Sequence, residues 1–320
     1  MNARQSPDAL GVPSEAELDA LYRSLSNWGR WGKDDERGAL NHLRPEHRVA
    51  AAALVEEGLG VSLAHDLGTD PSAENPYPAD HHMLAAGDAR DAAGIPGYEA
   101  SRDYIGTHVH GLGVTHIDAL CHMFVRGKMY NGVPASEVRS DGARRNTVLS
   151  LADGVLGRGV LLDIAVLRGV AYLEGNAAVG VAELEAAEHG QGVRVGTGDI
   201  LLVATGRDAR RREQGGVLNP ADGMAGLHPE CLAWLREREI AVLGSDGISD
   251  PMPGVGTPNW PFPIHQIGIT GMGLHLIDNL ALGALSQACS ERARWAFLFT
   301  LGVLRVPGGT GCPVNPIALL

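Results

Sequence analysis

The chain has 320 residues, of which 44% are hydrophobic and 20% are charged, values typical of a globular protein with a full core. Its net charge of −12 argues against nucleic-acid and anionic-membrane partners, because both call for a basic surface. The N-terminal segment lacks the continuous apolar core of a signal peptide, and no run approaches the roughly 18 apolar residues of a membrane-spanning helix. The four cysteines form no C-x-x-C pair, which argues against a disulfide framework and a thiolate zinc site, so we expect a cytoplasmic protein.

Two helices are predicted near the N-terminus. Ser14 and Glu17 have the spacing of a capping box and predict a helix that runs to about Leu25. A second helix is predicted over residues 45–57, because Pro45 suits a first helical turn and a glycine follows at position 58.

The loop between these helices carries Trp28 and Trp31. Large aromatic rings are rarely left in water, so these two either plug an edge of the core or line a pocket.

A strand is predicted over residues 61–67, followed by a long excursion over the surface at 68–102. The excursion carries His81 and His82, which either reach a substrate or are merely solvated. A further strand over 103–109 then leads into a histidine-rich segment.

The second half of the chain alternates strands and helices. Strands are predicted over residues 157–167, 199–205, 240–243 and 295–304, and helices over 181–189 and 229–239. The intervening segment 206–226 reads as a polar loop. Its four arginines either meet an anionic group or form a solvated charge run: Arg207, Arg210, Arg211 and Arg212.

Asp246 follows the strand predicted over 240–243. A carboxylate there either orients a neighbouring metal ligand or forms a turn with its own backbone. Because strands and helices interleave, we expect a mixed α/β fold. No biased linker divides the chain, so a single domain over residues 1–320 is expected, with an N-terminal helical or lid segment to about residue 60.

The segment THVHGLGVTHIDALCH, residues 107–122, is the densest group of chemically active side chains. An extended segment sends residues i and i+2 to one face, so His116 and Asp118 can bind the same ion. His122 lies four residues beyond Asp118, where it can contact the substrate or orient a ligand. Imidazole with carboxylate suits zinc, manganese or ferrous iron better than calcium or magnesium. The neighbouring Cys121 is expected to be a small buried hydrophobe rather than a nucleophile.

Two ligands are too few for tight binding, so others must come from elsewhere. The best candidates are His265 and Asp278, both flanked by apolar residues, although such a residue alone is more often a satisfied polar group of the core than a ligand.

The segment THIDALCH resembles the second half of the H-x-G-T-H-x-D-x-P-x-H signature of the cyclase-like metal-dependent hydrolases, the group that contains bacterial kynurenine formamidase and isatin hydrolase. Further segments resemble landmarks of that family in family order: NWGRWGKDDERGALNHL at 27–43, GKMYNG at 127–132, RGVLLDIA at 158–165 and PIHQIGITGMGLHLIDNL at 263–280. Three positions depart from the signature. Leu112 stands where the family has its first metal-binding histidine, Val114 where it has glycine, and Leu120 where it has proline.

The resemblance implies the mixed-sheet swivelling β/β/α fold of that family and a site that holds Zn²⁺ or Mn²⁺. His265 and Asp278 match a family histidine and glutamate of the metal site, with aspartate in place of glutamate. Because Leu112 removes one ligand, a single metal is expected, unless His110 or His108 folds back toward the ion. His122 is then the natural proton carrier.

The expected reaction is hydrolysis of a carbon–nitrogen bond in a small amide, formamide or cyclic amide by metal-activated water. Two alternatives remain open at this point: a metal-dependent lactonase or cyclase, and a non-catalytic protein whose metal site has decayed. Members of the family commonly assemble as homodimers or homotetramers, and the resemblance implies the same here.

Overall fold

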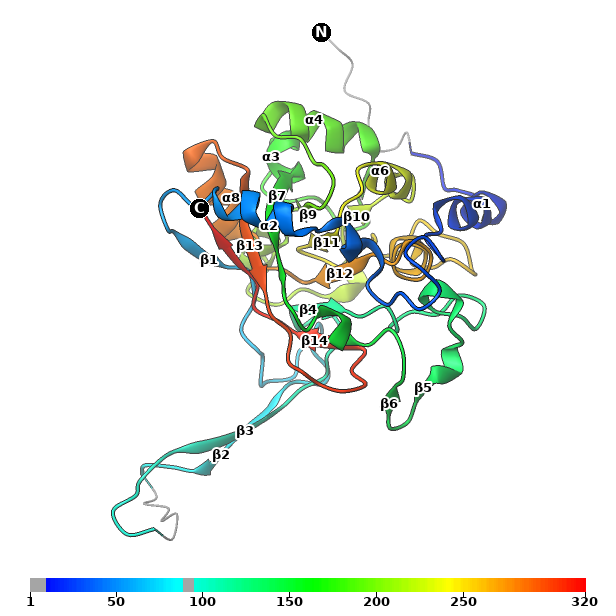
Figure 1. Ribbon diagram of the computed structural model, residues 1–320. Helices are drawn as coiled ribbons and strands as arrows, with labels where there is room; N and C mark the ends of the chain where they lie inside the picture. The colour runs from blue at the N-terminus through cyan, green and yellow to red at the C-terminus, as the bar shows by residue number, and fades with distance from the viewer. Residues whose placement is uncertain (1–9, 89–94) are drawn as a thin grey trace.

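The buried strands predicted from the sequence lie at the centre of a nine-stranded mixed sheet. The computed structural model describes residues 10–88 and 95–320 (Figure 1). The strands are β1 (Gly60–Ser62), β2 (Asp80–Ala85), β3 (Arg102–Gly106), β4 (His116–Asp118), β5 (Val138–Arg139), β6 (Gly142–Ala143), β7 (Val155–Asp163), β8 (Ala178–Val179), β9 (Ile200–Ala204), β10 (Gly226–Leu227), β11 (Val242–Ser245), β12 (His275–Asp278), β13 (Ala296–Leu301), β14 (Gly311–Pro313) and β15 (Ile317–Leu319).

The helices fall mostly between these strands. The α-helices are α1 (Glu15–Leu25), α2 (Pro45–Ala52), α3 (Ile164–Arg168), α4 (Val181–Gln191), α5 (Arg207–Glu213), α6 (Cys231–Glu237), α7 (Pro263–His265) and α8 (Gly283–Arg292). Short 3₁₀ turns are η2 (Gly38–His42), η3 (Tyr130–Gly132), η4 (Ala135–Glu137), η5 (Val148–Leu151) and η6 (Pro220–Asp222), and η7 (Gln266–Met272) is π-helical.

The large sheet has the order β1-β15-β13-β7-β9-β11-β12-β4-β14. Strands β7, β9, β11 and β12 are parallel to one another, whereas β4 and β14 extend the sheet antiparallel on one side, and β13, β15 and β1 on the other. The mixed α/β fold expected from the interleaved pattern is confirmed, and the pairing of β4 with β12 decides where the site lies.

Both faces of the central strands are buried, which explains why they read as continuous apolar runs. In β9, Leu201 and Val203 pack into a core with residues of α1, α4, α6 and η7. Ile200 and Leu202 point the other way, into a second core with residues of α8. Each fully buried aliphatic side chain contributes about 1.5–3 kcal/mol relative to exposure, so the two cores fix the sheet firmly.

Several predicted elements are confirmed and others are wrong at their ends. Helix α1 has the predicted capping box, in which the Ser14 hydroxyl accepts from the Glu17 amide and the Glu17 carboxylate accepts from the Ser14 amide. Helix α2 ends five residues early because the chain turns to pair with the C-terminus, where the Glu57 and Gly58 amides both donate to Leu320.

The predicted polar loop at 206–226 is wrong in its first part, which forms α5. The carboxylate of Asp246 accepts from the backbone amides of Thr205, Gly206 and Arg207, so it binds the start of this helix. The strand predicted over 157–167 is also too long. It ends at Asp163, whose side chain accepts from the Val166 amide and begins α3.

The predicted surface excursion at 68–102 contains β2, which pairs antiparallel with β3 in a two-stranded ribbon. This arm, defined as residues 77–88 and 95–106, projects away from the sheet (Figure 1). None of the described helices has the length and apolar content needed to cross a bilayer.

Candidate metal centre

The pairing of β4 with β12 brings the predicted ligands together. The register places His116 directly opposite Asp278, so their side chains share one face of the sheet. Asp118 lies two residues along β4 and points the same way. His265 arrives from α7, immediately before the π-helical turn of η7, an irregularity that is frequent at functional sites.

Asp118 is the centre of the cluster, and its side chain is only 1% exposed. Its Oδ1 atom lies 2.9 Å from Nδ1 of His110, 3.5 Å from Nε2 of His116 and 4.0 Å from Nε2 of His122. The rings of His110 and His122 stack with their centroids 3.7 Å apart.

His265 and Asp278 complete the cluster on the other side of Asp118. Nε2 of His265 lies 3.2 Å from Oδ2 of Asp278 and 3.6 Å from Oδ2 of Asp118. The structure therefore brings together the five residues His116, Asp118, His122, His265 and Asp278, and it adds His110.

The donor set fits a divalent cation. Within the part of the chain that the structure describes, both carboxylate oxygens of Asp118 and Oδ1 of Asp278 are buried yet accept no hydrogen bond of good geometry. Buried carboxylates without partners are costly unless they coordinate a metal. Two sets of ligand atoms lie within 4.8 Å of one another, His116 with Asp118 and Asp278, and His110 with Asp118 and His122. They share Asp118, and imidazole with carboxylate is a donor set suited to zinc or manganese.

The imidazoles of His265 and His116 are each held in orientation by an acceptor at Nδ1, on the side of the ring opposite Nε2. Nδ1 of His265 lies 2.7 Å from Oδ2 of Asp250, and Nδ1 of His116 lies 2.9 Å from the carbonyl oxygen of Val114. A proton on Nδ1 in each ring leaves Nε2 free to face the carboxylates, and such outer contacts usually accompany metal-binding histidines.

Burial and neighbouring groups shift the pKa values of the cluster residues. Burial opposes the charged form of His116, but the neighbouring Asp118 raises its pKa to about 9. Burial also works against ionised Asp118, yet the neighbouring His110 and His116 imidazoles hold its pKa well below the usual range. Burial lowers the pKa of His122 to about 4. Asp118 is therefore ionised and able to act as a metal ligand, while His122 stands neutral beside it.

His110 provides the imidazole that is missing at position 112. Leu112 offers no ligand atom, but Gly111 adopts a φ of 136°, and the chain folds His110 back against Asp118. The structure distinguishes the two histidines proposed as substitutes for Leu112. His108 is exposed and stacks on Tyr77 with ring centroids 4.9 Å apart, outside the cluster.

The remaining candidates lie elsewhere. His82 is on the exposed arm beside Asp80 and Tyr104. Trp28 packs edge-on against Tyr22 and donates from Nε1 to the Thr270 carbonyl, which fits a plug at the edge of the core. Asp246 was expected either to orient a metal ligand or to form a turn with its own backbone, but its carboxylate accepts from backbone amides at the start of α5.

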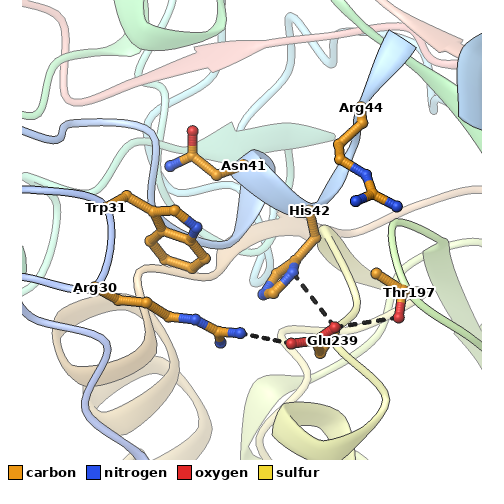
Figure 2. A pocket seen from close by; sticks show the side chains of 7 residues that line it. All are labelled: Arg30, Trp31, Asn41, His42, Arg44, Thr197 and Glu239. Carbon is orange, nitrogen blue, oxygen red and sulfur yellow. Dashed lines mark hydrogen bonds and ion pairs between the residues drawn. The ribbon is translucent and has the colours of Figure 1, made fainter. Parts of the chain in front are cut away.

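Trp31 lines a separate cavity of about 380 Å³, drawn in Figure 2, together with Arg30, Asn41, His42, Arg44, Thr197 and Glu239. Thr197 precedes β9 and Glu239 precedes β11, whereas Asp278 ends β12 and Asp250 follows β11. The cavity and the metal centre therefore lie at opposite ends of the parallel strands.

The arginines were expected to be either anion-binding or solvated, and the solvated alternative is wrong for Arg207. Its side chain is 4% exposed and pairs with Glu74. Asp250, which lies 2.7 Å from His265, was not predicted from the sequence; the available signal was a second aspartate after the end of β11.

Cys121 is fully buried, and burial raises the pKa of its thiol to about 12. A thiol in that state is a poor nucleophile, which agrees with the expected role as a small hydrophobe.

The fold and this cluster define an α/β protein with a mixed sheet and a His/Asp centre, and the comparisons give its family. The family model described as "Putative cyclase" matches residues 59–250. The chain is 30% identical to a solved structure described as a novel cyclase, with a TM-score of 0.83, over 92% of this chain and 100% of that one. The protein belongs to this cyclase family.

More distant structures share the fold. Isatin hydrolase A from Ralstonia solanacearum is 21% identical, with a TM-score of 0.57, over 81% of this chain and 91% of that one. An isatin hydrolase bound to the product analogue thioisatinate is 18% identical, with a TM-score of 0.56, over 84% and 94%. No curated protein sequence matches the chain.

Proposed function

We propose that this protein is a metal-dependent hydrolase that cleaves a carbon–nitrogen bond in a small amide, formamide or cyclic amide. The observation that carries the proposal is the convergence of His116, Asp118, His265 and Asp278 around carboxylate oxygens that are buried and accept no well-formed hydrogen bond among the described residues. The fold shared with isatin hydrolases favours a cyclic amide within this class.

In this proposal His116, Asp118 and Asp278 hold a Zn²⁺ or Mn²⁺ ion, with His265 beside them. Such an ion acts as a Lewis acid toward a carbonyl group and makes water a better nucleophile at neutral pH. Asp250 keeps the His265 ring in place, and the Val114 carbonyl does the same for His116. These contacts pre-orient the ligands, so little reorganisation is needed when an ion binds.

His122 is the proposed proton carrier. Its ring is a quarter exposed, stacks on His110 and lies 4.0 Å from Asp118. Because it is held neutral, it can take a proton from the attacking water while the new carbon–oxygen bond forms. The same proton then goes to the leaving nitrogen as the carbon–nitrogen bond breaks.

The same arrangement suits the hydrolysis of lactones, because it requires no protein nucleophile. The family model is described as a putative cyclase, so lactone hydrolysis is kept as a second candidate reaction. The chemistry of the leaving group distinguishes amide hydrolysis from lactone hydrolysis. An amidase needs a proton delivered to nitrogen, whereas an activated lactone releases a more stable oxygen anion, so loss of His122 should impair amide cleavage more than lactone cleavage.

The test begins with metal content, measured by plasma mass spectrometry on protein purified without added metal or chelator. About one zinc or manganese ion per chain is expected, followed by turnover of amides or cyclic amides on a substrate panel that includes lactones. About two ions per chain would assign His110 and His122 to a second site. No ion, and none taken up on dialysis, would overturn the hydrolase proposal.

We propose further that the chain assembles with a second copy through the arm. A two-stranded ribbon is marginal in water by itself, and seven large hydrophobic side chains of this arm are exposed: Tyr77, Met83, Leu84, Ile95, Tyr98, Tyr104 and Ile105. Together they expose on the order of 800 Å², about the area that each partner buries in a standard interface.

The exposed side chains occupy both faces of the ribbon. The register places His82 opposite Tyr104 on one face and His81 opposite Ile105 on the other. A closed two-fold assembly suits such an element, because each arm can lie against the other subunit.

Light scattering after gel filtration tests this assembly with the double variant Leu84→Ser, Ile105→Ser, and with Val49→Ser, an exposed valine on α2, as the control. We expect a dimer or tetramer for the wild type and the control, and a smaller species for the arm variant. A monomeric wild type would contradict the assembly.

A further inference from the structure

Asn279 stands directly after Asp278 and holds an unusual backbone position. It is buried, with 1% exposure, and its φ is 56°, in the left-handed region that asparagine and glycine tolerate better than other residues. Its amide nitrogen donates to the Gly247 carbonyl, and its own carbonyl accepts from the Thr115 hydroxyl at 2.6 Å. The residue is thereby tied to the segment after β11 and to the residue that precedes His116.

The side chain of Asn279 uses both of its amide donors on one loop. Nδ2 lies 2.8 Å from the carbonyl oxygen of Gly111 and 3.0 Å from that of Val114. This loop connects His110 with His116, and the Val114 carbonyl is also the acceptor for Nδ1 of His116. One amide group therefore braces the segment that carries two members of the metal cluster.

A buried arginine fixes the orientation of that amide. Nη1 of Arg207 lies 2.7 Å from Oδ1 of Asn279, and a guanidinium can only donate, so the oxygen must face Arg207 and the NH₂ group must face the loop. Arg207 is held in turn by Glu74, whose Oε1 lies 2.5 Å from Nη2. Neither side chain of this ion pair is more than 6% exposed.

The position of His110 depends on a turn at a glycine. Gly111 directly follows His110, and its φ of 136° turns the chain between His110 and His116. Gly111 allows that turn but does not dictate it, because glycine has the widest choice of backbone conformations. The Gly111 carbonyl, which Asn279 binds, marks the turn itself.

We propose that Asn279, oriented by Arg207, is a positioning residue for the metal centre: it holds the loop at 111–114 so that His110 and His116 face Asp118. The proposal rests on the proposed function, because it takes the cluster to bind a divalent ion. Asn279 itself contacts none of the reacting groups; it acts through the loop.

The main variant is Asn279→Gly, which removes the amide without backbone strain. Asn131→Gly is the matched control, because Asn131 also has a left-handed φ of 60° and its amide donates to the carbonyls of Gly32, Lys33 and Asp35, away from the cluster. A third variant, Asn279→Asp, keeps an acceptor for Arg207 and loses both donors to the loop.

Zinc affinity, measured by competition with a chromophoric chelator, and the visible absorption of the Co²⁺-substituted protein are the readouts. We expect Asn279→Gly and Asn279→Asp to weaken zinc binding about 10- to 100-fold and to shift the Co²⁺ spectrum away from that of the wild type. Asn131→Gly should leave affinity and spectrum within about twofold, whatever it does to the melting temperature.

Wild-type affinity and spectrum in Asn279→Asp would overturn the positioning role while leaving the metal site standing. An equal loss in Asn131→Gly would also overturn it, because a general loosening of the fold would then explain the result. A wild-type chain that binds neither Zn²⁺ nor Co²⁺ would remove the proposed function and this inference together.

Discussion

The two ends of the central parallel strands both carry a cluster of polar and charged side chains, but the carboxylates in the two clusters have different partners. At the start of β9 and β11, Glu239 accepts from Arg30 at 2.5 Å and from the Thr197 hydroxyl at 3.2 Å, and His42 lies 3.8 Å away (Figure 2). At the end of β12 and beyond β11, the oxygens of Asp118 lie among imidazoles without a well-formed hydrogen bond among the described residues.

This difference separates a structural polar cluster from a binding site. In the cavity of Figure 2 each carboxylate oxygen of Glu239 already has a protein partner, so the charges are balanced within the chain. In the candidate metal centre the imidazole and carboxylate atoms converge on one another, an arrangement that a bound cation would stabilise. The size of a cavity is a poorer guide to chemistry than the hydrogen bonding of the groups that line it.

The strongest test replaces a central carboxylate by an amide at each end. Asp118→Asn should lower zinc affinity by at least about 100-fold, because it removes the charge shared by both sets of ligand atoms. Glu239→Gln is the matched control and should keep the metal content of the wild type. The metal content of both purified variants is measured by mass spectrometry. Full metal content in Asp118→Asn would contradict the proposal that Asp118 is a metal ligand.

The proton-carrier role predicts a variant that binds metal but does not turn over. His122→Ala should keep about one ion per chain and lose about 100- to 10,000-fold in kcat on an amide substrate, because proton delivery to nitrogen is lost. Metal content and steady-state kinetics on the same preparation provide the measurement. Unchanged turnover would refute the role, and loss of the ion would make His122 a ligand instead.

Asp250→Asn probes the support behind His265. The amide can still accept from Nδ1, but it no longer balances the charge of the ring, so zinc affinity should fall about 10- to 100-fold with the fold intact. Chelator competition gives the affinity, and far-ultraviolet circular dichroism gives the fold. Wild-type affinity would mean that Asp250 only caps the turn at Ile264.

The smallest expected effect lies in the cavity and concerns pH. Burial lowers the pKa of His42 to about 4, below its value in the unfolded chain. The contribution of His42 to stability is therefore fully present above about pH 6.5 and is lost as the pH falls toward 4. In His42→Asn the free energy of unfolding should depend less on pH, by about 2 kcal/mol between pH 7.5 and pH 4.5.

Urea unfolding of both proteins at the two pH values measures this slope. Other titrating groups, including those of the metal centre, are common to both proteins, so the difference reports His42. Identical pH dependence would show that the pKa of His42 is the same in the native and unfolded states, and would contradict the prediction.

Much of the fold follows from local pattern. The capping box at Ser14 and Glu17 and the buried apolar runs of β7 and β9 depend on neighbours in sequence, and they lie close to where the pattern predicts them. Element ends were less well predicted, because they depend on distant contacts, as where Asp246 binds the start of α5 or Leu320 draws the chain away from α2.

The sequence by itself determined which residue types are available to the candidate centre: the His116-x-Asp118 spacing and the candidates His122, His265 and Asp278. Only the tertiary structure decided which side chains meet. His110 rather than His108 reaches Asp118, Asp250 supports His265, and Arg207 is buried against Glu74 and Asn279. The reason is physical, because Arg207 meets residues 72 and 133 positions away in the chain, and the geometry of such contacts is set by strand register and packing rather than by local spacing.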